Sequence, residues 1–417
     1  MSDIVDIDRI GHRGDGVAET PEGTLFVPYT LAGERVRVER RGRRAEVIEI
    51  LEASPKRVAA PCPHFGPSLG AQDARCGGCA LQMLPLEETR LLKHRFVAEA
   101  LAKSGLETEV RPAFGAPLGA RRRAVFSATL AGREIRLGFH ERGSRRLVDL
   151  ATCLVVRPAI VSALPLLRRL AQLLARPKRE LRLTVLETRS GLDIAGEGAG
   201  SIQASAAARI AELLSGQAVA RLVVDGDILF QLEEPQLEVG GVTVSPPPAA
   251  FVQACRESET AMARLVAEHC AGAKRVADLF SGLGTFSFVV GRTARVTAVE
   301  AEGVALAALA AAVRGAQGLK PIETLARDLL RFPLAPNELS RFDAVVLDPP
   351  WDGARAQAES LAASKVARIA FVSCNPASLA RDLRILVDGG YRLNSVTPID
   401  QFVYSAETEA VALLERE

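Results

Sequence analysis

The stretch DLFSGLGTFS, residues 278–287, decides the fold of the C-terminal part of the chain. It completes the apolar run KRVADLF, whose length and composition are those of a buried strand. Gly282 and Gly284 follow this run, and glycines at such a point let the backbone approach a ligand at the N-terminus of the next helix. The stretch therefore predicts a strand, a tight turn that contacts a ligand, and a helix.

Four further apolar runs follow it, separated by helical segments: ARVTAVE, KPIETLA, FDAVVLD and ARIAFVS. Short apolar strands that alternate with helices indicate βαβ units and a parallel sheet covered on both faces. We therefore predict an α/β, Rossmann-like domain over residues 251–417. In such a domain, ligands bind at the carboxyl ends of the strands.

The rest of the chain divides into two further predicted domains. Residues 1–54 alternate about five short β-like runs with turns, which indicates a small β-barrel. Residues 55–250 are expected to form a central α+β domain. It begins with a segment rich in Pro, Gly and Cys over 55–80, and an amphipathic helix is predicted over 86–104.

Positive charge is concentrated in the central part of the chain. Residues 61–190 carry 22 Lys and Arg against 11 Asp and Glu, although the net charge of the whole chain is only +2. Nearly all of this charge is Arg, which stacks on bases and binds phosphates bidentately. A solvated Arg-rich face would look the same, so charge alone leaves nucleic-acid binding open.

The sequence gives no sign of a membrane or export segment. No apolar run reaches the roughly 18 residues that a membrane span needs. The N-terminus MSDIVDIDRIGHRGDG is acidic and mixed, unlike a signal peptide. We therefore expect a cytoplasmic protein without a membrane partner, and we take a monomer as the default.

Two acids lie at or just after the ends of the second and third predicted strands. Glu300 ends the second, eighteen residues after Gly282, where an acid can accept hydrogen bonds from ribose hydroxyls. This spacing alone leaves nicotinamide cofactors and S-adenosylmethionine open. Ser287 stands where the dinucleotide fingerprint has its third Gly, and this favours S-adenosylmethionine. Asp328 follows the third strand and could accept from an adenine amino group, although a surface carboxylate would explain it nearly as well.

The fourth and fifth strands are followed by candidate reacting groups. We expect Asp348 to be the last residue of the fourth strand. Pro349 and Pro350 should then form a rigid, extended turn, which could be one wall of a slot for a flat base. Cys374 comes just after the fifth strand, in SCNPASLARD, residues 373–382. It would therefore lie beside Asp348 at the same edge of the sheet.

A thiol at this place suits methyl transfer to a pyrimidine. Carbon 5 of the ring is too weak a nucleophile to attack a sulfonium, but a thiolate that adds at carbon 6 makes it enolate-like. A base must then remove the carbon-5 proton so that the thiolate can leave. Near the end of the chain, in ETEAVALLE, Glu407 and Glu409 would point to the same side of a strand, and either could be this base.

The sequence resembles a known family. FVQA (251–254), DLFSGLGTFS, DPP (348–350) and SCNPASLARD are similar to the successive motifs of the bacterial RNA 5-methyluridine methyltransferases. Those enzymes methylate uridine in ribosomal or transfer RNA with S-adenosylmethionine, and the resemblance runs nearly end to end. It implies a class I methyltransferase domain with Cys374 as nucleophile and Glu409 as general base. It also implies cofactor contacts by Gln253, Phe280, Thr285, Glu300, Asp328 and Asp348.

The N-terminal half resembles other parts of the same family. Residues 1–52 are similar to a TRAM domain, a small RNA-binding barrel, and CGGCALQ (76–82) to the cysteine motif of members with a [4Fe-4S] cluster. In those members five residues usually separate the first two cysteines, and the thirteen residues between Cys62 and Cys76 are interpreted as an insertion. Zinc would suit the same thiolates. Because the motif is more usual in ribosomal members, 23S ribosomal RNA is the expected target and transfer RNA the alternative. The implied ligands are Cys62, Cys76, Cys79 and Cys153.

Three residues depart from the family pattern. Cys255 replaces the usual Asn, Trp351 the usual Arg after Asp-Pro-Pro, and Glu407 the usual His before the base. Trp351, the only Trp in the chain, would offer a stacking surface to a flipped base. Glu407 would raise the pKa of the neighbouring base. Two other hypotheses remain: an RNA cytosine-5-methyltransferase, which typically has a Cys where Trp351 stands, and a non-catalytic RNA-binding iron–sulfur scaffold.

Overall fold

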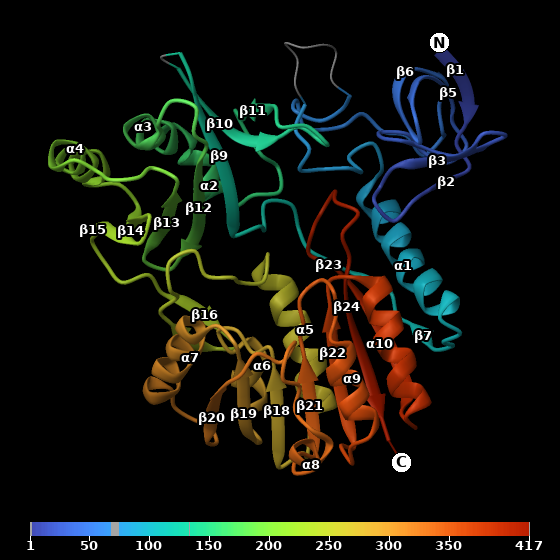
Figure 1. Ribbon diagram of the computed structural model, residues 1–417, viewed down its shortest axis with the longest axis vertical. Helices are drawn as coiled ribbons and strands as arrows, with labels where there is room; N and C mark the ends of the chain where they lie inside the picture. The colour runs from blue at the N-terminus through green and yellow to red at the C-terminus, as the bar shows by residue number, and fades with distance from the viewer. Residues whose placement is uncertain (1, 68–74, 133, 417) are drawn as a thin grey trace.

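The computed structural model describes residues 2–67, 75–132 and 134–416 (Figure 1). These residues form sheets of six, seven and nine strands and a two-stranded ribbon, β16(Leu237–Val239) with β17(Val242–Val244). In Figure 1 the six-stranded and seven-stranded sheets lie side by side in the upper half, and the nine-stranded sheet fills the lower half. The fold class is the predicted one, a Rossmann-like α/β domain preceded by a barrel-like sheet and an α+β part.

The N-terminal six-stranded sheet is curved and barrel-like, and it is called the barrel below (Figure 1). Along β5, Val36 and Val38 are buried while Arg35 and Glu39 are exposed, which is the alternation of a strand with one face on a core. Six strands are found where about five were predicted. Their order is β1-β5-β6-β4-β3-β2, and their bounds are β1(Ser2–Asp6), β2(Arg9–Ile10), β3(Gly16–Thr20), β4(Gly23–Val27), β5(Arg35–Arg41) and β6(Arg44–Glu52).

The seven-stranded sheet has the order β11-β10-β9-β12-β13-β14-β15. It packs against α2(Pro158–Ser162), α3(Leu164–Leu174) and α4(Ala204–Leu214). Leu167, Leu170 and Leu174 of α3 are buried because their spacing of three and four residues places them on one helix face. The strands are β9(Arg123–Ala131), β10(Glu134–His140), β11(Leu147–Asp149), β12(Leu181–Thr188), β13(Gly191–Glu197), β14(Val219–Val224) and β15(Asp227–Gln231).

The nine-stranded sheet contains all five apolar runs predicted as strands. They are β18(Arg275–Leu279), β19(Arg295–Glu300), β20(Ile322–Ala326), β21(Ala344–Leu347) and β22(Arg368–Ser373), and they pair in parallel. One prediction fails by a residue, because β21 ends at Leu347 and Asp348 lies just beyond it.

The remainder of this sheet is antiparallel at one side. The order β20-β19-β18-β21-β22-β24-β23 places β24(Glu409–Glu415) between β22 and β23(Arg392–Asp400), antiparallel to both. This return brings the start of β24 back to the carboxyl end of β22. The covering helices are α5(Arg256–His269), α6(Thr285–Val290), α7(Gly303–Gly315), α8(Pro336–Leu339), α9(Arg355–Ala362) and α10(Pro376–Asp388).

A segment far upstream completes this domain. The predicted amphipathic helix forms α1(Leu86–Lys103), and its residues Val97 and Leu101 are buried in the same core as α10. The short strands β7(Glu109–Val110) and β8(Phe114–Gly115) then pair with β23. The predicted domain boundaries stay predictions. Within the described residues, no helix is both long and apolar enough to cross a membrane.

Candidate active site

A cavity of about 590 Å³, here called the strand-end cavity, opens at the carboxyl ends of the parallel strands. Its volume is in the range of small-molecule sites. The structure brings nearly all of the predicted cofactor and catalytic residues to its wall, although they come from seven separate segments of the chain. Those that line it are Gln253, Phe280, Gly282, Thr285, Glu300, Asp328, Asp348, Cys374 and Glu409.

The glycine turn between β18 and α6 forms one wall of this cavity. Gly282 has φ of +52°, which favours glycine, and its backbone N–H donates to Glu300 Oε2 over 2.9 Å. Gly284 does not line the cavity. A Cβ at Gly284 would lie 2.8 Å from Phe288 and 3.1 Å from Leu309. The first glycine thus faces the cavity, whereas the second lets α6 and α7 pack closely.

Ser287, which takes the place of the third fingerprint glycine, holds an acid behind this turn. Its Oγ donates to Asp278 Oδ2 over 2.5 Å. Burial raises the pKa of Asp278 to about 7, while the hydrogen bonds from Ser287 oppose that rise. Among the described residues, Asp278 Oδ1 and Ser281 Oγ are buried without a hydrogen-bond partner. Buried polar atoms of this kind are suited to bind the polar groups of a ligand.

Glu300 and Asp328 are held in place at the ends of β19 and β20 by the backbone that follows them. Glu300 Oε1 accepts from the next two backbone N–H groups over 2.7 and 2.9 Å. Asp328 Oδ1 accepts from two N–H groups over 3.1 and 3.3 Å. A carboxylate has about four acceptor positions. Each acid therefore retains acceptor capacity toward a ligand in the strand-end cavity.

Cys374 lies between the end of β22 and the start of α10. Pro376 occupies the first turn of the helix, and the Asn375 side chain caps it by accepting from a backbone N–H over 3.0 Å. Asn375 Nδ2 and Ser378 Oγ both donate to the carbonyl of Trp351, over 3.1 and 3.0 Å. The turn that carries the thiol is thereby fixed against the segment after Asp-Pro-Pro.

The protein groups around Cys374 disfavour a thiolate. Burial raises the pKa of Cys374 to about 12, and the negative charges of Glu409 and Asp348 add to the effect. The strand-end cavity thus concentrates acids around a thiol. A cationic ligand would lower the pKa of every one of these groups, because an opposite charge favours the ionised form of an acid.

The acid expected to act as a base is Glu409, the buried first residue of β24. Gln401 Nε2 donates to Glu409 Oε2 over 2.6 Å and to Gln253 Oε1 over 3.0 Å, and Gln253 Nε2 donates to Asp348 Oδ2 over 3.0 Å. Burial raises the pKa of Glu409 to about 7, opposed by the bond from Gln401. Burial and the charge of Glu409 raise the pKa of Asp348 well above its usual value.

Two expectations about the neighbours of this acid are corrected. Glu407 precedes β24, so it does not share a strand face with Glu409, and it lines a different cavity. Burial, rather than the charge of Glu407, is the main cause of the raised pKa of Glu409. Cys255 lies outside the strand-end cavity and is buried in an apolar cluster with Val403 and Tyr404.

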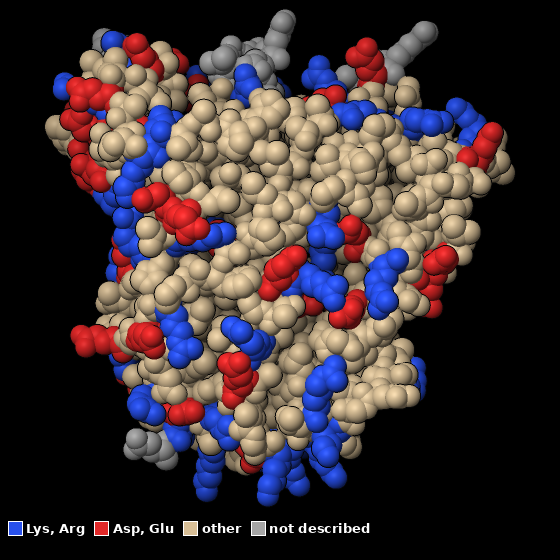
Figure 2. Space-filling view, turned by 180° about the vertical axis from the view of Figure 1, so that it is seen from behind, with Lys and Arg blue, Asp and Glu red and all other residues tan. Residues whose placement is uncertain are grey.

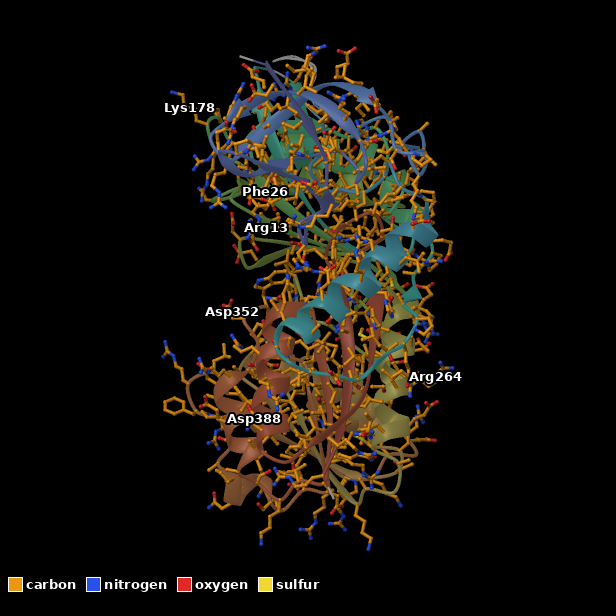
Figure 3. The ribbon with its side chains drawn as sticks, turned by 90° about the vertical axis from the view of Figure 1, so that its right-hand side faces the viewer. Arg13, Phe26, Lys178, Arg264, Asp352 and Asp388 are labelled. Atoms are coloured by element: carbon orange, nitrogen blue, oxygen red, sulfur yellow. The ribbon has the colours of Figure 1, made fainter. Side chains whose placement is uncertain are left out.

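A second cavity of about 800 Å³ adjoins the first and is called here the basic-rimmed cavity. Trp351 lines both cavities, and its side chain is 51% exposed. Arg13 lies in the half of the molecule that contains the barrel, and Asp352 lies on the same side in the half that contains the nine-stranded sheet (Figure 3). The basic residues that line this cavity come from the barrel, α1 and the β10–β11 turn: His12, Arg13, Lys103 and Arg142.

The predicted metal ligands line a third space, the cysteine cavity, of about 240 Å³. All four thiols are free, and burial raises the pKa of Cys76 to about 11, that of Cys79 to about 12 and that of Cys153. Within the described ranges, no three His, Cys, Asp or Glu residues are placed so that they could hold a metal ion. The predicted insertion 63–75 is described only in part, because residues 68–74 lie outside the described residues. The four cysteines that line the cavity are Cys62, Cys76, Cys79 and Cys153.

The surface charge is mixed on the face turned away from the view of Figure 1. Figure 2 shows Lys and Arg interspersed with Asp and Glu there, around a broad area without charged side chains. The positive excess of residues 61–190 therefore does not form one uniform patch on this face. The basic residues with a defined place near the site are those that line the basic-rimmed cavity.

The sheet order, the site and the relatives of this chain define a class of protein, the S-adenosylmethionine-dependent methyltransferases. The family model described as tRNA (uracil-5-)-methyltransferase matches residues 323–417. A protein of Rhizobium meliloti described as an RNA methyltransferase is 46% identical over 99% of both chains. A 23S rRNA (uracil(1939)-C(5))-methyltransferase of Chromohalobacter salexigens is 33% identical, and the match covers 100% of this chain and 90% of that protein.

A solved structure has the same fold over nearly the whole chain. The tRNA (uracil-54, C5)-methyltransferase of Pyrococcus abyssi, in complex with S-adenosyl-L-homocysteine, superposes with a TM-score of 0.73 at 21% identity. The match covers 99% of this chain and 100% of that one. Together with the full-length relatives, this shows that the chain belongs to the family of S-adenosylmethionine-dependent RNA uracil-C5 methyltransferases.

Proposed function

We propose that this protein transfers a methyl group from S-adenosylmethionine to carbon 5 of a uridine in RNA, through a covalent bond between Cys374 and carbon 6. The observation that carries the proposal is the shared cavity of Cys374, Glu409 and the glycine turn at Gly282. A thiol, a base and a cofactor-type turn are the three parts that this chemistry requires.

The residues of the strand-end cavity suit a cationic methyl donor. S-adenosylmethionine supplies a methyl group on a positively charged sulfur. Glu300 would accept from ribose hydroxyls and Asp328 from the adenine amino group, and the unpartnered Ser281 hydroxyl would bind another polar group. The raised pKa values of Asp348 and Glu409 fall when a positive charge enters, so binding prepares both acids for ionisation.

The catalytic steps follow from the two reacting side chains. The Cys374 thiolate adds to carbon 6, and the electron pair of the ring double bond moves to carbon 5, which then attacks the methyl group. Carbon 5 now carries both a proton and a methyl group. Glu409 removes the proton, the ring double bond re-forms, and the bond between carbon 6 and sulfur breaks to release the thiolate. A pKa near 7 suits this step, because the ionised base is present at neutral pH.

Replacement of the thiol tests this mechanism. Cys374→Ala should abolish methylation of uridine in RNA and retain binding of S-adenosylhomocysteine, measured by calorimetry. RNA that contains 5-fluorouridine should trap a covalent complex with the wild-type protein, because fluorine at carbon 5 cannot leave as a proton. Full methylation activity in Cys374→Ala would exclude the covalent mechanism.

We propose 23S ribosomal RNA as the target and the basic-rimmed cavity, together with the TRAM-like barrel, as part of the RNA-binding surface. The full-length relative from Chromohalobacter salexigens acts on 23S rRNA, and the four-cysteine motif supports the same choice. The structure with the same fold is that of a transfer-RNA enzyme, so transfer RNA is the second candidate. Mass spectrometry of RNA from a deletion strain identifies the uridine that loses its methyl group and decides between them.

We further propose that the four cysteines of the cysteine cavity hold a [4Fe-4S] cluster. The support is the cysteine motif together with the lining of one cavity by all four thiols. Thiolate ligands suit an iron–sulfur cluster, and zinc is the alternative on the same four cysteines. Methyl transfer moves no net electrons, so its expected role is in folding or RNA placement. Iron and sulfide analysis of anaerobically purified protein, with zinc measured alongside, tests this.

A further inference from the structure

Gln401 is a buried polar residue for which sequence analysis gave no role. It follows the last residue of β23, and its side chain lies between the two elements that carry Gln253 and Glu409. Both polar atoms of its amide have hydrogen-bond partners. Oε1 accepts from the N–H of Ala254 over 3.0 Å, and Nε2 donates to Gln253 and to Glu409. A buried amide with this set of contacts has one stable orientation.

The backbone N–H of Ala254 sets the orientation of the Gln401 amide. The Gln401 amide in turn sets the orientation of the Gln253 amide. The N–H of Ala254 can only donate, so it must face Gln401 Oε1, and Gln401 Nε2 is left to face Glu409 and Gln253 Oε1. Gln253 Nε2 must then face Asp348. A flipped Gln401 would place an oxygen against the Glu409 carboxylate and two donors against each other. Both acids are therefore offered N–H donors, which stabilise the ionised form.

The backbone on both sides of Gln401 is also held. Lys93 of α1 is fully buried, forms an ion pair with Asp400, and donates to the carbonyl of Phe402 over 2.9 Å. One ammonium group thus fixes the residues directly before and directly after Gln401. A side chain held in this way can orient its partners, because its own position does not depend on theirs.

We propose that Gln401 is a positioning residue for proton removal from carbon 5, acting by holding Glu409 in place and in its ionised form. The inference rests on the proposed function, in which Glu409 is the base. Gln401 itself touches no reacting atom in this scheme. Its hydrogen bond to the carboxylate opposes the burial that raises the pKa of Glu409. Other charged or titratable groups near this corner include Asp348, Cys374, Asp278 behind Asp348, the Lys93–Asp400 ion pair, and Glu407 at the loop.

Loss of this contact should affect one step of the reaction. In Gln401→Met the side chain keeps its length but offers no donor, so the pKa of Glu409 should rise and its carboxylate should lose its fixed direction. Addition of Cys374 and methyl transfer need no proton acceptor at carbon 5, and they should proceed. The variant should therefore accumulate a methylated covalent RNA–protein complex on ordinary uridine RNA near neutral pH. Release of product should slow by about tenfold, the factor for a hydrogen bond to a charged group.

The experiment follows decay of the covalent complex against pH. In a plot of decay rate against pH, the acidic limb is the range in which the rate falls as pH falls. This limb should move to higher pH in Gln401→Met, and raising the pH should restore release of the product. Gln357→Met is the matched control, because Gln357 is also buried and its amide bonds the backbone of Leu334, over 2.9 and 3.2 Å, away from the strand-end cavity. That control should lose stability without any change in the pH profile.

The outcomes separate this inference from the proposed function. A wild-type protein that neither methylates uridine nor traps 5-fluorouridine RNA overturns the proposed function. A normal wild type with an unshifted acidic limb and no accumulated complex in Gln401→Met overturns only the role of Gln401. If Gln401→Met does not fold, as judged by binding of S-adenosylhomocysteine, Gln401→Glu provides the same test. It keeps an acceptor for Ala254 and places a second acid beside Glu409, so the limb should again move to higher pH.

Discussion

The strand-end cavity and the basic-rimmed cavity meet at Trp351 but differ in charge and in origin. The first contains buried acids, including Asp348 and Glu409, and most of its wall comes from one C-terminal domain. The second is lined by basic residues such as Arg13 and Lys103, which come from the barrel and from α1. An acidic pocket suits a cationic methyl donor, and a basic surface suits a polyanion. The contrast indicates that chemistry and RNA binding can be altered separately.

The largest effect should come from the base of the strand-end cavity. Glu409→Gln keeps the size of the side chain and an acceptor for Gln401, but an amide cannot take the carbon-5 proton. Turnover should fall by about 10²–10⁴-fold, the usual contribution of a general base. The covalent complex with uridine RNA should accumulate and survive denaturing electrophoresis.

Glu407→Gln is the control for that variant. Glu407 lines the basic-rimmed cavity and precedes β24, so its loss should leave turnover near the wild-type value. If Glu407→Gln accumulated the covalent complex and Glu409→Gln did not, the assignment of the base would be reversed.

The pH dependence of the wild-type protein should report the same acid. Burial raises the pKa of Glu409 to about 7, and the ionised form is the active one. The decay of the covalent complex should therefore slow as pH falls through about 7, by roughly tenfold for each further pH unit. Above that pKa the rate should level off. A decay rate that did not change with pH in this range would exclude Glu409 as the base.

Local sequence patterns predicted the strand-end cavity well because each part of it follows a strand. The apolar runs fixed β18 to β22, and the residues that come after such strands must meet at one edge of a parallel sheet. Gly282, Glu300 and Cys374 could be found in this way. The one-residue error at Asp348 arose because an apolar run does not show where its hydrogen bonding ends.

What the sequence did not reveal depends on contacts between distant segments. Gln401 gains its environment only when β23 returns beside Gln253, 148 residues away. Gly284 was predicted to be a ligand-binding glycine, but its lack of a Cβ instead allows close packing against Phe288 and Leu309. Likewise, nothing local shows that α1 packs on α10. The sequence signal that could have indicated Gln401 is its position, because a polar residue directly follows the end of an apolar strand there.

Trp351 should contribute to RNA binding without contributing to cofactor binding. Its half-exposed side chain lies where the two cavities meet, and an aromatic ring there can stack on a base. Trp351→Ala should weaken RNA binding about tenfold, given a stacking energy of roughly 1–3 kcal/mol per base. Binding of S-adenosylhomocysteine should not change.

The chain offers a direct signal and a matched control for this prediction. Trp351 is the only Trp, so RNA should quench the intrinsic tryptophan fluorescence of the wild-type protein. Trp351→Phe keeps an aromatic face and should retain most of the affinity. Equal RNA affinity in the wild type and in Trp351→Ala, with no quenching, would show that the ring does not contact RNA.

The smallest effect should come from single basic residues of the basic-rimmed cavity. Arg13 lies on the barrel side of this cavity (Figure 3), and a contact with one phosphate would release about one counterion. Arg13→Ala should therefore weaken RNA binding a few-fold and reduce the slope of log affinity against log salt by about 1. Arg264→Ala is the control, since Arg264 is exposed on α5 and does not line this cavity. An unchanged salt slope in Arg13→Ala, or an equal change in Arg264→Ala, would show that Arg13 makes no specific phosphate contact in the basic-rimmed cavity.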